Sequence, residues 1–214
     1  MNHRSPSRDR WLRFYNTVLY ETFPAIYNAM DWLTFGTWWR LVRRAIQHVP
    51  AGGKVLEIGF GPGRLQNELA MRMRFCCGLD LAFGMCRFTK RRLLRAGLSQ
   101  RLVNGNVLHL PYPDDTFDTV VSTFAFSGIP QGDQAMREIS RLTAPGGQVV
   151  IVDIGLPQNH DRLGTFFARL WERMGDCLYD YPTIMQNAGL DPVWFEEYGP
   201  GNHIRVIVGQ KRPR

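Results

Sequence analysis

The sequence lacks the motifs that mark disulfide scaffolds, zinc sites and activated nucleophiles. Its four cysteines, Cys76, Cys77, Cys86 and Cys177, form neither a Cys-x-x-Cys pair nor a zinc spacing. Cys76 and Cys77 fall within an apolar run, so we expect free core thiols in a reducing cytoplasm. Gly-x-Ser-x-Gly and His-Glu-x-x-His patterns are also missing. The sequence therefore predicts no metal site and no nucleophilic triad.

Long hydrophobic runs are absent as well. No apolar run approaches the roughly 18 residues that a membrane-spanning helix needs. The polar, arginine-bearing start lacks the apolar core of a signal peptide, which predicts a cytoplasmic protein. There is no internal repeat and no low-complexity tract. With 214 residues, of which 44% are hydrophobic and 21% charged, the chain is long enough for one α/β domain and too short for two.

The most informative stretch is residues 54–63. An apolar run with a single acid, Glu57, ends in three glycines at alternate positions, Gly59, Gly61 and Gly63. This pattern indicates a buried strand that enters a tight turn, because glycine tolerates positive φ and a close backbone approach. Apolar residues then recur at helical spacing, so the unit is strand, turn and helix. We expect free backbone N–H groups and a helix N-terminus beside any ligand over the turn.

Two interpretations of this turn compete besides a purely structural one. The dinucleotide fingerprint requires a glycine at the sixth position, which here is Arg64, so that fingerprint fails. What remains is Glu-x-Gly-x-Gly-x-Gly, which resembles the first motif of the class I S-adenosylmethionine-dependent methyltransferases.

A second apolar run ends in Asp80, which lies 23 positions beyond Glu57. A carboxylate at the end of the second strand suits the hydroxyls of a ribose, and we expect it to lie close to the glycine turn. The alternative is an N-cap of the helix that follows. In the resembling family a methionine at the position of Met85 often lies against the adenine, although Met85 could equally be a core residue.

Residues 104–118 and 142–153 extend the resemblance. The first segment is similar to the family's Gly-Asp-Ala-x-x-Leu-Pro-Phe-x-Asp-x-Ser-Phe-Asp stretch, with Asn106 where an acid usually accepts a hydrogen bond from the adenine. The amide oxygen of Asn106 can accept the same bond, and the ubiquinone/menaquinone-biosynthesis methyltransferases resemble this sequence in carrying asparagine there. The second segment resembles the Leu-x-Pro-Gly-Gly stretch before the fifth strand.

The resemblance implies S-adenosylmethionine as the cofactor. It also implies the residues that bind it: Glu57, Gly59, Phe60, Gly61, Pro62, Gly63, Asp80, Leu81, Met85, Asn106, Val107, Ser122 and Thr123.

Strands and helices alternate up to residue 153, which predicts an α/β fold with a doubly wound, mostly parallel sheet. The resemblance implies seven strands in a Rossmann-like methyltransferase fold, with an antiparallel last strand. We expect residues 51–214 to form the cofactor-binding domain and residues 1–50 to form a helical cap of the same domain. Helices are predicted over residues 9–22, from residue 24 onward, and over residues 38–46.

After residue 153 an apolar stripe recurs at helical spacing. It comprises Leu163, Phe166, Phe167, Leu170, Trp171 and Met174. Such a stripe normally packs in part against the core, and its place after the fifth strand makes it a candidate wall for an apolar substrate. Residues 191–197 and 203–208 are predicted to form a closing hairpin.

The net charge of +7 and a pI near 9.6 leave three interpretations. Six cations occur in a stretch without an acid: Arg87, Lys90, Arg91, Arg92, Arg95 and Arg101. Nucleic acid is disfavoured, because no RNA-binding module is recognisable. Peripheral contact with an anionic membrane surface at its inner face is the second interpretation, since Arg40, Arg43 and Arg44 share a helix with two tryptophans. A solvated basic face is the third.

The sequence thus predicts transfer of a methyl group to a small, lipophilic, quinone-precursor-like acceptor. A phospholipid headgroup N-methyltransferase is one alternative, and a non-catalytic, cofactor-binding regulatory or complex subunit is another. A general base is needed only for an acceptor that loses a proton. His109, His160, Asp161 and Tyr179 are the candidates, and none is assigned, nor is an oligomeric state.

Overall fold

The computed structural model describes residues 37–213. The helices predicted before residue 37, and with them most of the predicted cap, lie outside the described residues. Two short helices, α3 (Thr37–Val42) and α4 (Arg44–Gln47), replace the single helix predicted over residues 38–46. The alternation of strands and helices begins with β1 (Lys54–Ile58), α5 (Arg64–Arg72), β2 (Phe75–Asp80), α6 (Phe83–Arg95), β3 (Leu102–Asn104) and β4 (Phe117–Thr123).

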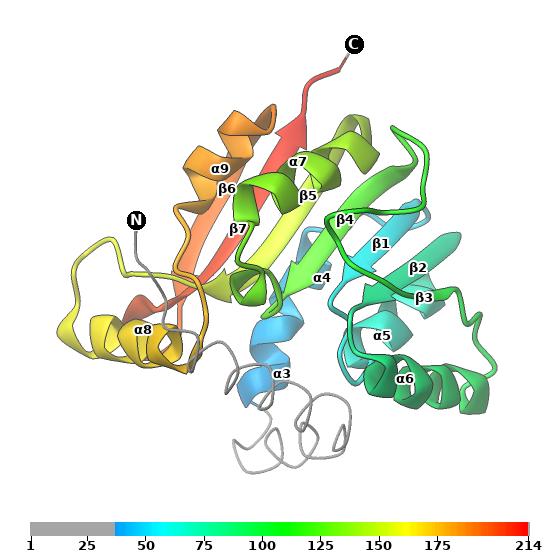
Figure 1. The fold of residues 1–214 in the computed structure, drawn as a ribbon, viewed down its shortest axis with the longest axis horizontal. Coiled ribbons are helices and arrows are strands. Elements are labelled where there is room, and N and C mark those ends of the chain that lie inside the picture. Colours follow the sequence, from blue (N-terminus) through cyan, green and yellow to red (C-terminus); the bar gives the residue numbers. More distant parts are fainter. Residues whose placement is uncertain (1–36, 214) are drawn as a thin grey trace.

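The second half of the chain completes one sheet (Figure 1). Its elements are η2 (Phe126–Gly128), α7 (Gly132–Leu142), β5 (Thr143–Ile154), α8 (Arg162–Met174), α9 (Tyr181–Asn187), β6 (Leu190–Tyr198), η3 (Pro200–Asn202) and β7 (Ile204–Lys211). The strand order is β3-β2-β1-β4-β5-β7-β6. The pairs among β1 to β5 are parallel, whereas β7 runs antiparallel to both β5 and β6. The predicted doubly wound sheet, its antiparallel last strand and the closing hairpin are confirmed.

The core lies on both faces of the sheet, which explains why the strands read as continuous apolar runs. On one face, alternate residues such as Leu56 and Ile151 pack against α7 and α9. On the other, Val55, Val121 and Val150 pack against α4 and α5. Cys76 and Cys77 are buried in β2, as predicted. Over residues 37–213, every helix is too short or too polar to cross a membrane.

Helix α8 differs from its prediction. Leu163, Phe166, Leu170 and Met174 are exposed, by 53%, 60%, 41% and 39%. Its buried residues are the small ones, Gly164 and Ala168. The reason is a close approach to η3: a Cβ on Gly164 would lie 1.7 Å from the carbonyl oxygen of Gly201. The helix therefore packs through its small residues and turns the large apolar ones outward.

Candidate cofactor site at the carboxyl edge of the sheet

The glycine turn follows β1 and is held in a left-handed conformation. Gly59, Gly61 and Gly63 have φ values of 70°, 49° and 70°. A Cβ on Gly59 would lie 2.2 Å from the Cβ of Ala125, and one on Gly63 would lie 2.2 Å from the side chain of Thr89. A Cβ on Gly61 would meet nothing within 4 Å. Two of the glycines are thus required by packing within the chain, whereas Gly61 leaves open space above the turn.

Asp80 lies directly against this turn, as the sequence predicted. Its Oδ2 accepts a hydrogen bond of 2.8 Å from the Gly61 N–H, and its Oδ1 accepts one of 2.9 Å from the Ala82 N–H. The residue is only 8% exposed. The N-cap of α6 is Ala82, so Asp80 does not hold the N-cap position. The two backbone donors fix the rotation of the carboxylate at the end of β2.

The expectation of free N–H groups in the turn is wrong for the three glycines. The Gly59 N–H donates to the carbonyl of Leu79, that of Gly61 to Asp80, and that of Gly63 to the carbonyl of Phe60. The hydroxyl of Thr89 donates to the Gly61 carbonyl at 2.9 Å. No pattern in the sequence points to Thr89, because its position in the middle of α6 marks it only as a helix residue. The turn is therefore preformed by contacts within the chain.

Glu57 is buried beside this turn, with 1% of its surface exposed. Its Oε2 has no hydrogen-bond partner. Burial, and then the charge of Asp80, raise the pKa of the Glu57 carboxyl well above its usual value. A buried acid with an open acceptor position is expected where a polar or cationic group of a ligand completes the site.

The loop after β3 lies against the end of β2. The side-chain amide of Asn104 donates to the carbonyls of Asp80 and Leu81, at 3.0 and 2.8 Å. Asn106 is exposed, and its Oδ1 accepts a hydrogen bond of 3.0 Å from the Leu108 N–H. Its predicted contact with the adenine stays a prediction. Val107 is 6% exposed and belongs to the core.

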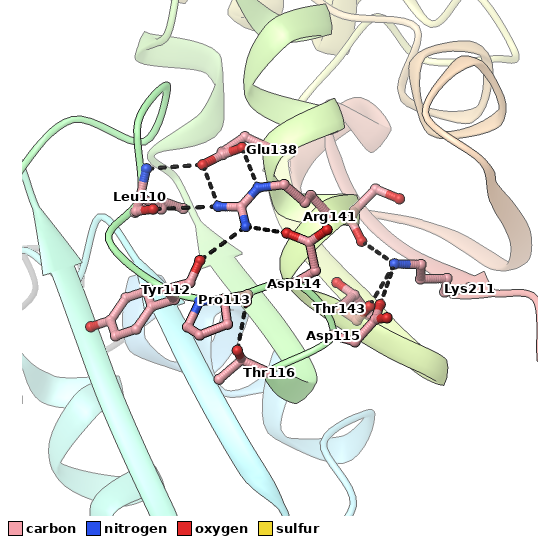
Figure 2. Close-up of polar contacts among 11 residues, drawn as sticks. Leu110, Tyr112, Pro113, Asp114, Asp115, Thr116, Glu138, Arg141, Thr143 and Lys211 are labelled. Atoms are coloured by element: carbon pink, nitrogen blue, oxygen red, sulfur yellow. Dashed lines mark hydrogen bonds and ion pairs between the residues drawn. The ribbon is translucent and has the colours of Figure 1, made fainter.

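The same loop is anchored at the opposite edge of the sheet by Arg141 (Figure 2). Its guanidinium donates to the carbonyls of Leu110 and Tyr112, at 3.3 and 2.9 Å. It also forms ion pairs with Asp114, at 2.6 Å, and Glu138, at 2.7 Å. The Glu138 carboxylate in turn accepts from the Leu110 N–H at 2.9 Å. The hydrogen bonds with Arg141 lower the pKa of the Glu138 carboxyl.

Further predicted residues lie at the end of β4 and in the segment after β2. Ser122 ends the buried part of β4 beside Ile58, and its hydroxyl is fully buried without a partner. Thr123 follows it and is partly exposed. Leu81 is 72% exposed next to Asp80. Met85 is fully buried against Phe60, so its side chain has a packing role and the adenine contact stays a prediction.

A buried polar cluster at the end of β5 was not predicted. Asp153 is fully buried and accepts hydrogen bonds of 2.8 Å from the N–H groups of Ser127 and Ile154. The Ser127 hydroxyl donates to Asp176 at 2.8 Å. Burial raises the pKa of Asp153 to about 6. The hydroxyl of Tyr181 is buried without a hydrogen-bond partner, and burial, followed by the charge of Asp153, raises the pKa of this hydroxyl. The signal in the sequence was the same as for Asp80, an acid that ends an apolar run.

The four base candidates do not gather in this cluster. Asp161 caps α8 by accepting from the Gly164 N–H. The Tyr179 hydroxyl donates to the Ile129 carbonyl and accepts from the Gly132 N–H, so it fixes backbone. His109 and His160 are exposed. Among residues 37–213, no group of three acid, histidine or cysteine side chains could hold a metal ion.

These residues suit an adenosyl ligand. The space above Gly61, the fixed carboxylate of Asp80 and the unpaired buried atoms of Glu57 and Ser122 offer the acceptors that ribose hydroxyls and an ammonium group require. They come from the carboxyl ends of neighbouring parallel strands, on both sides of the point where the strand order reverses. This is where open α/β sheets bind ligands.

The fold and this site define a class I S-adenosylmethionine-dependent methyltransferase domain. Residues 56–151 match the family model described as "Methyltransferase domain", and over these residues the chain belongs to that family. S-adenosylmethionine is the cofactor of the class, so the predicted cofactor is confirmed at this level.

Curated relatives are similar over part of their length. A methyltransferase named GfsG from Streptomyces halstedii is 31% identical over 151 residues, which cover 67% of this chain and 54% of that protein. A demethylmenaquinone methyltransferase from Mycolicibacterium paratuberculosis is 32% identical over 124 residues, or 57% and 50% of the two chains. The chain spans about half the length of the curated relatives it matches.

Solved structures share the fold at lower identity. A methyltransferase from Thermotoga maritima, described as SAM-dependent, aligns with a TM-score of 0.71 at 17% identity and covers 92% of this chain and 100% of that one. The [4+2]-cyclase SpnF aligns with a TM-score of 0.70 at 16% identity, over 82% and 81% of the two chains.

Proposed function

We propose that this chain transfers the methyl group of S-adenosylmethionine to a small, lipophilic, quinone-precursor-like acceptor in the cytoplasm. The observation that carries the cofactor half of this proposal is the contact of 2.8 Å between Asp80 and the glycine turn. We retain residues 51–214 as the cofactor-binding domain and residues 1–50 as its cap. When bound, the cofactor supplies a sulfonium methyl group, so transfer is a single in-line displacement.

The chain's part in this reaction is to bind, orient and exclude water. Asp80, whose carboxylate is oriented by the N–H groups of Gly61 and Ala82, would accept from the ribose hydroxyls. The open face of Gly61 lets a ligand approach the backbone. The unpaired oxygens of Glu57 and Ser122 would accept from the polar end of the cofactor. Leu81, which is exposed beside Asp80, would cover an apolar part of it.

Two observations support the choice of acceptor. The motifs resemble the quinone-biosynthesis branch, and several of the similar curated proteins are demethylmenaquinone methyltransferases. Large apolar side chains are also exposed at the same edge of the sheet as the site: Leu81, Phe83, Leu163 and Phe166. Apolar surface near a site favours an apolar substrate.

Two alternatives have specific support. The arginines and apolar residues of α8 would also suit a phospholipid headgroup at an interface, as for a headgroup N-methyltransferase. A non-catalytic cofactor-binding subunit remains a second candidate, because a fold does not determine a reaction. The likeness of the fold to a [4+2]-cyclase illustrates this point.

Calorimetric titration with S-adenosylmethionine tests the cofactor half. Asp80→Ala and Gly61→Asn should each weaken binding by at least about tenfold. Asparagine is chosen because it tolerates the positive φ of this position while its side chain fills the open space. Thermal unfolding shows whether both variants are folded, and Met71→Ser, an exposed change on α5, serves as the control. Wild-type affinity in both folded variants would refute the assigned site.

Incubation with methyl-labelled cofactor tests the acceptor half. We expect label in a reduced demethylmenaquinone added as the probe, or in the quinone fraction of a bacterial lipid extract. Label in phospholipid would favour the headgroup enzyme. Cofactor binding without label in any fraction would favour a non-catalytic subunit.

A further inference from the structure

The outward face of α8 carries two adjacent stripes of exposed side chains, one apolar and one basic. Leu163, Phe166, Leu170 and Met174 follow the spacing i, i+3, i+7 and i+11, and all four are exposed. Arg162, Arg169 and Arg173 follow the spacing i, i+7 and i+11, and all three are exposed. Side chains at these spacings lie on one side of a helix. Each arginine immediately precedes an apolar residue, so the basic stripe runs beside the apolar one.

This arrangement is built into the packing of the helix. The inward side consists of Gly164 and Ala168, and the backbone of Gly201 approaches Gly164 too closely for any side chain. The Phe167 ring lies against the His203 ring, with centroids 5.2 Å apart. The helix cannot rotate to bury its larger apolar residues without separating these contacts. Four large apolar side chains are therefore held in solvent, a cost that an unpartnered surface helix does not normally carry.

We propose that the outward face of α8 docks on an anionic lipid bilayer, with the helix lying in the plane of the interface. An interfacial helix has an apolar stripe that enters the headgroup region and a basic stripe that pairs with anionic lipid. Arginine suits this position because its aliphatic stem extends along apolar surface while the guanidinium stays with the headgroups. The acid on α8, Glu172, is paired with Arg169 at 2.8 Å and is half-buried.

The position of α8 relates this surface to the site. The helix follows β5 and lies at the edge of the sheet where the parallel strands end, which is also the edge of the glycine turn (Figure 1). Helix α6 starts from this edge too, and its exposed side bears Arg87, Lys90, Arg91 and Arg95. Docking through α8 would turn the carboxyl edge toward the membrane, where a lipophilic acceptor dissolves.

Charge distinguishes the bilayer from other occupants of this face. A second copy of the chain would bring its own arginine stripe against the first, and like charges at an interface are unfavourable. Nucleic acid would pair with the arginines and leave Leu163, Leu170 and Met174 without an apolar partner. An anionic bilayer satisfies both stripes, and the net charge of +7 favours its approach.

Vesicle flotation with the full chain tests the proposal and needs no methyl acceptor, so its outcome is independent of the proposed reaction. The probes are phosphatidylcholine vesicles with and without about one third phosphatidylglycerol, at low and high salt. The wild-type chain should float with the anionic vesicles at low salt. Phe166→Ser with Leu170→Ser should lower the partition coefficient at least about tenfold, a difference of about 1.4 kcal/mol. Replacement of all three arginines by glutamine should lower it by a similar factor or more.

The matched control is Met71→Ser with Val193→Ser, which removes two apolar residues of similar exposure, 61% and 56%, from α5 and β6. It should bind as the wild type does. Hydrogen exchange should slow in residues 162–174 when vesicles are added, and not in α5.

Failure of the wild-type chain to float, or flotation of the Phe166–Leu170 variant at the wild-type level, would overturn the proposal. Light scattering that shows a dimer in the wild type and a monomer in this variant would assign the face to a second copy instead. Binding to single-stranded RNA that is lost in the arginine variant, without flotation, would assign the basic stripe to nucleic acid.

Discussion

The two edges of the sheet differ in whether their buried polar groups have hydrogen-bond partners within the chain. At the edge where β5 begins, Arg141 joins two carboxylates and two carbonyls, and Lys211 bonds to Asp115 and to the carbonyls of Ser140 and Thr143 (Figure 2). At the edge where β5 ends, buried atoms go without partners. Over the described chain, the buried side-chain atoms without a hydrogen bond belong to Glu57, Gln66, Ser122, Tyr181 and Arg205.

We call the edge where β5 begins the structural edge, and the edge where β5 ends, which carries the candidate cofactor site, the binding edge. A buried polar group without a partner is unfavourable by roughly 1–3 kcal/mol, so native chains retain few of them. None of the five belongs to the Arg141 network, and all lie in the carboxyl half of the sheet or in the segments that border it. At the structural edge, side chains of the chain itself form the hydrogen bonds that such groups need. At the other edge the proposed cofactor would supply partners for those of the five that lie at the site, Glu57 and Ser122.

The largest effect on the free energy of unfolding is expected from a substitution in the Arg141 network of the structural edge. Arg141→Met should lower the free energy of unfolding by about 3 kcal/mol, because it leaves Glu138 and the carbonyls of Leu110 and Tyr112 without their donor. Denaturant titration measures the change. Arg212→Gln, which opens an exposed ion pair with Asp191, is the control and should have far less effect. Equal losses in the two variants would show that the network has no special stability.

A smaller effect concerns pH at the binding edge. Burial raises the pKa of Asp153 to about 6, compared with about 3.9 in an unfolded chain. The folded state therefore holds an extra proton between these values, and the stability due to this group falls as the pH rises from about 4 to about 6. Relative to Asp153→Asn, the wild type should lose roughly 2–3 kcal/mol over this range. A difference that does not change with pH would show that Asp153 titrates normally.

The smallest effect compares one buried hydroxyl from each edge. Ser122→Ala removes an unpaired group and should leave stability unchanged or raise it by up to about 1 kcal/mol. Thr143→Val removes a hydroxyl that donates to the Ile139 carbonyl at 2.8 Å and should lower stability by about 1 kcal/mol. Calorimetry should show weaker S-adenosylmethionine binding in the Ser122 variant alone. The reverse pattern of affinities would contradict the division between the edges.

Most of the fold could be predicted from the sequence because its signals are local. The alternation of apolar runs with helical periods predicted the order of the elements, and the acid that ends β2 predicted a carboxylate beside the glycine turn. The proximity of Asp80 to the glycine turn follows from parallel strands whose carboxyl ends share an edge. Such inferences need only the period of the pattern and the direction of the chain.

What could not be predicted depends on contacts between distant segments. The N–H groups of Gly59 and Gly61 are occupied because Leu79 and Asp80 lie on the neighbouring strand, and no pattern near Gly59 indicates this. The outward direction of the α8 stripe depends on the backbone of Gly201, which follows β6. Periodicity identifies an apolar face of a helix, whereas only packing decides whether that face points inward.

The double attachment of Asp80 has a consequence for the entropy of binding. Because the backbone of Gly61 and Ala82 already holds the carboxylate, its side-chain rotor is restricted before any ligand arrives. Association of the proposed cofactor would then lose less conformational freedom at this residue, and the same enthalpy of contact would yield tighter binding. The acid and the turn therefore act as one preorganised unit, assembled when the sheet forms.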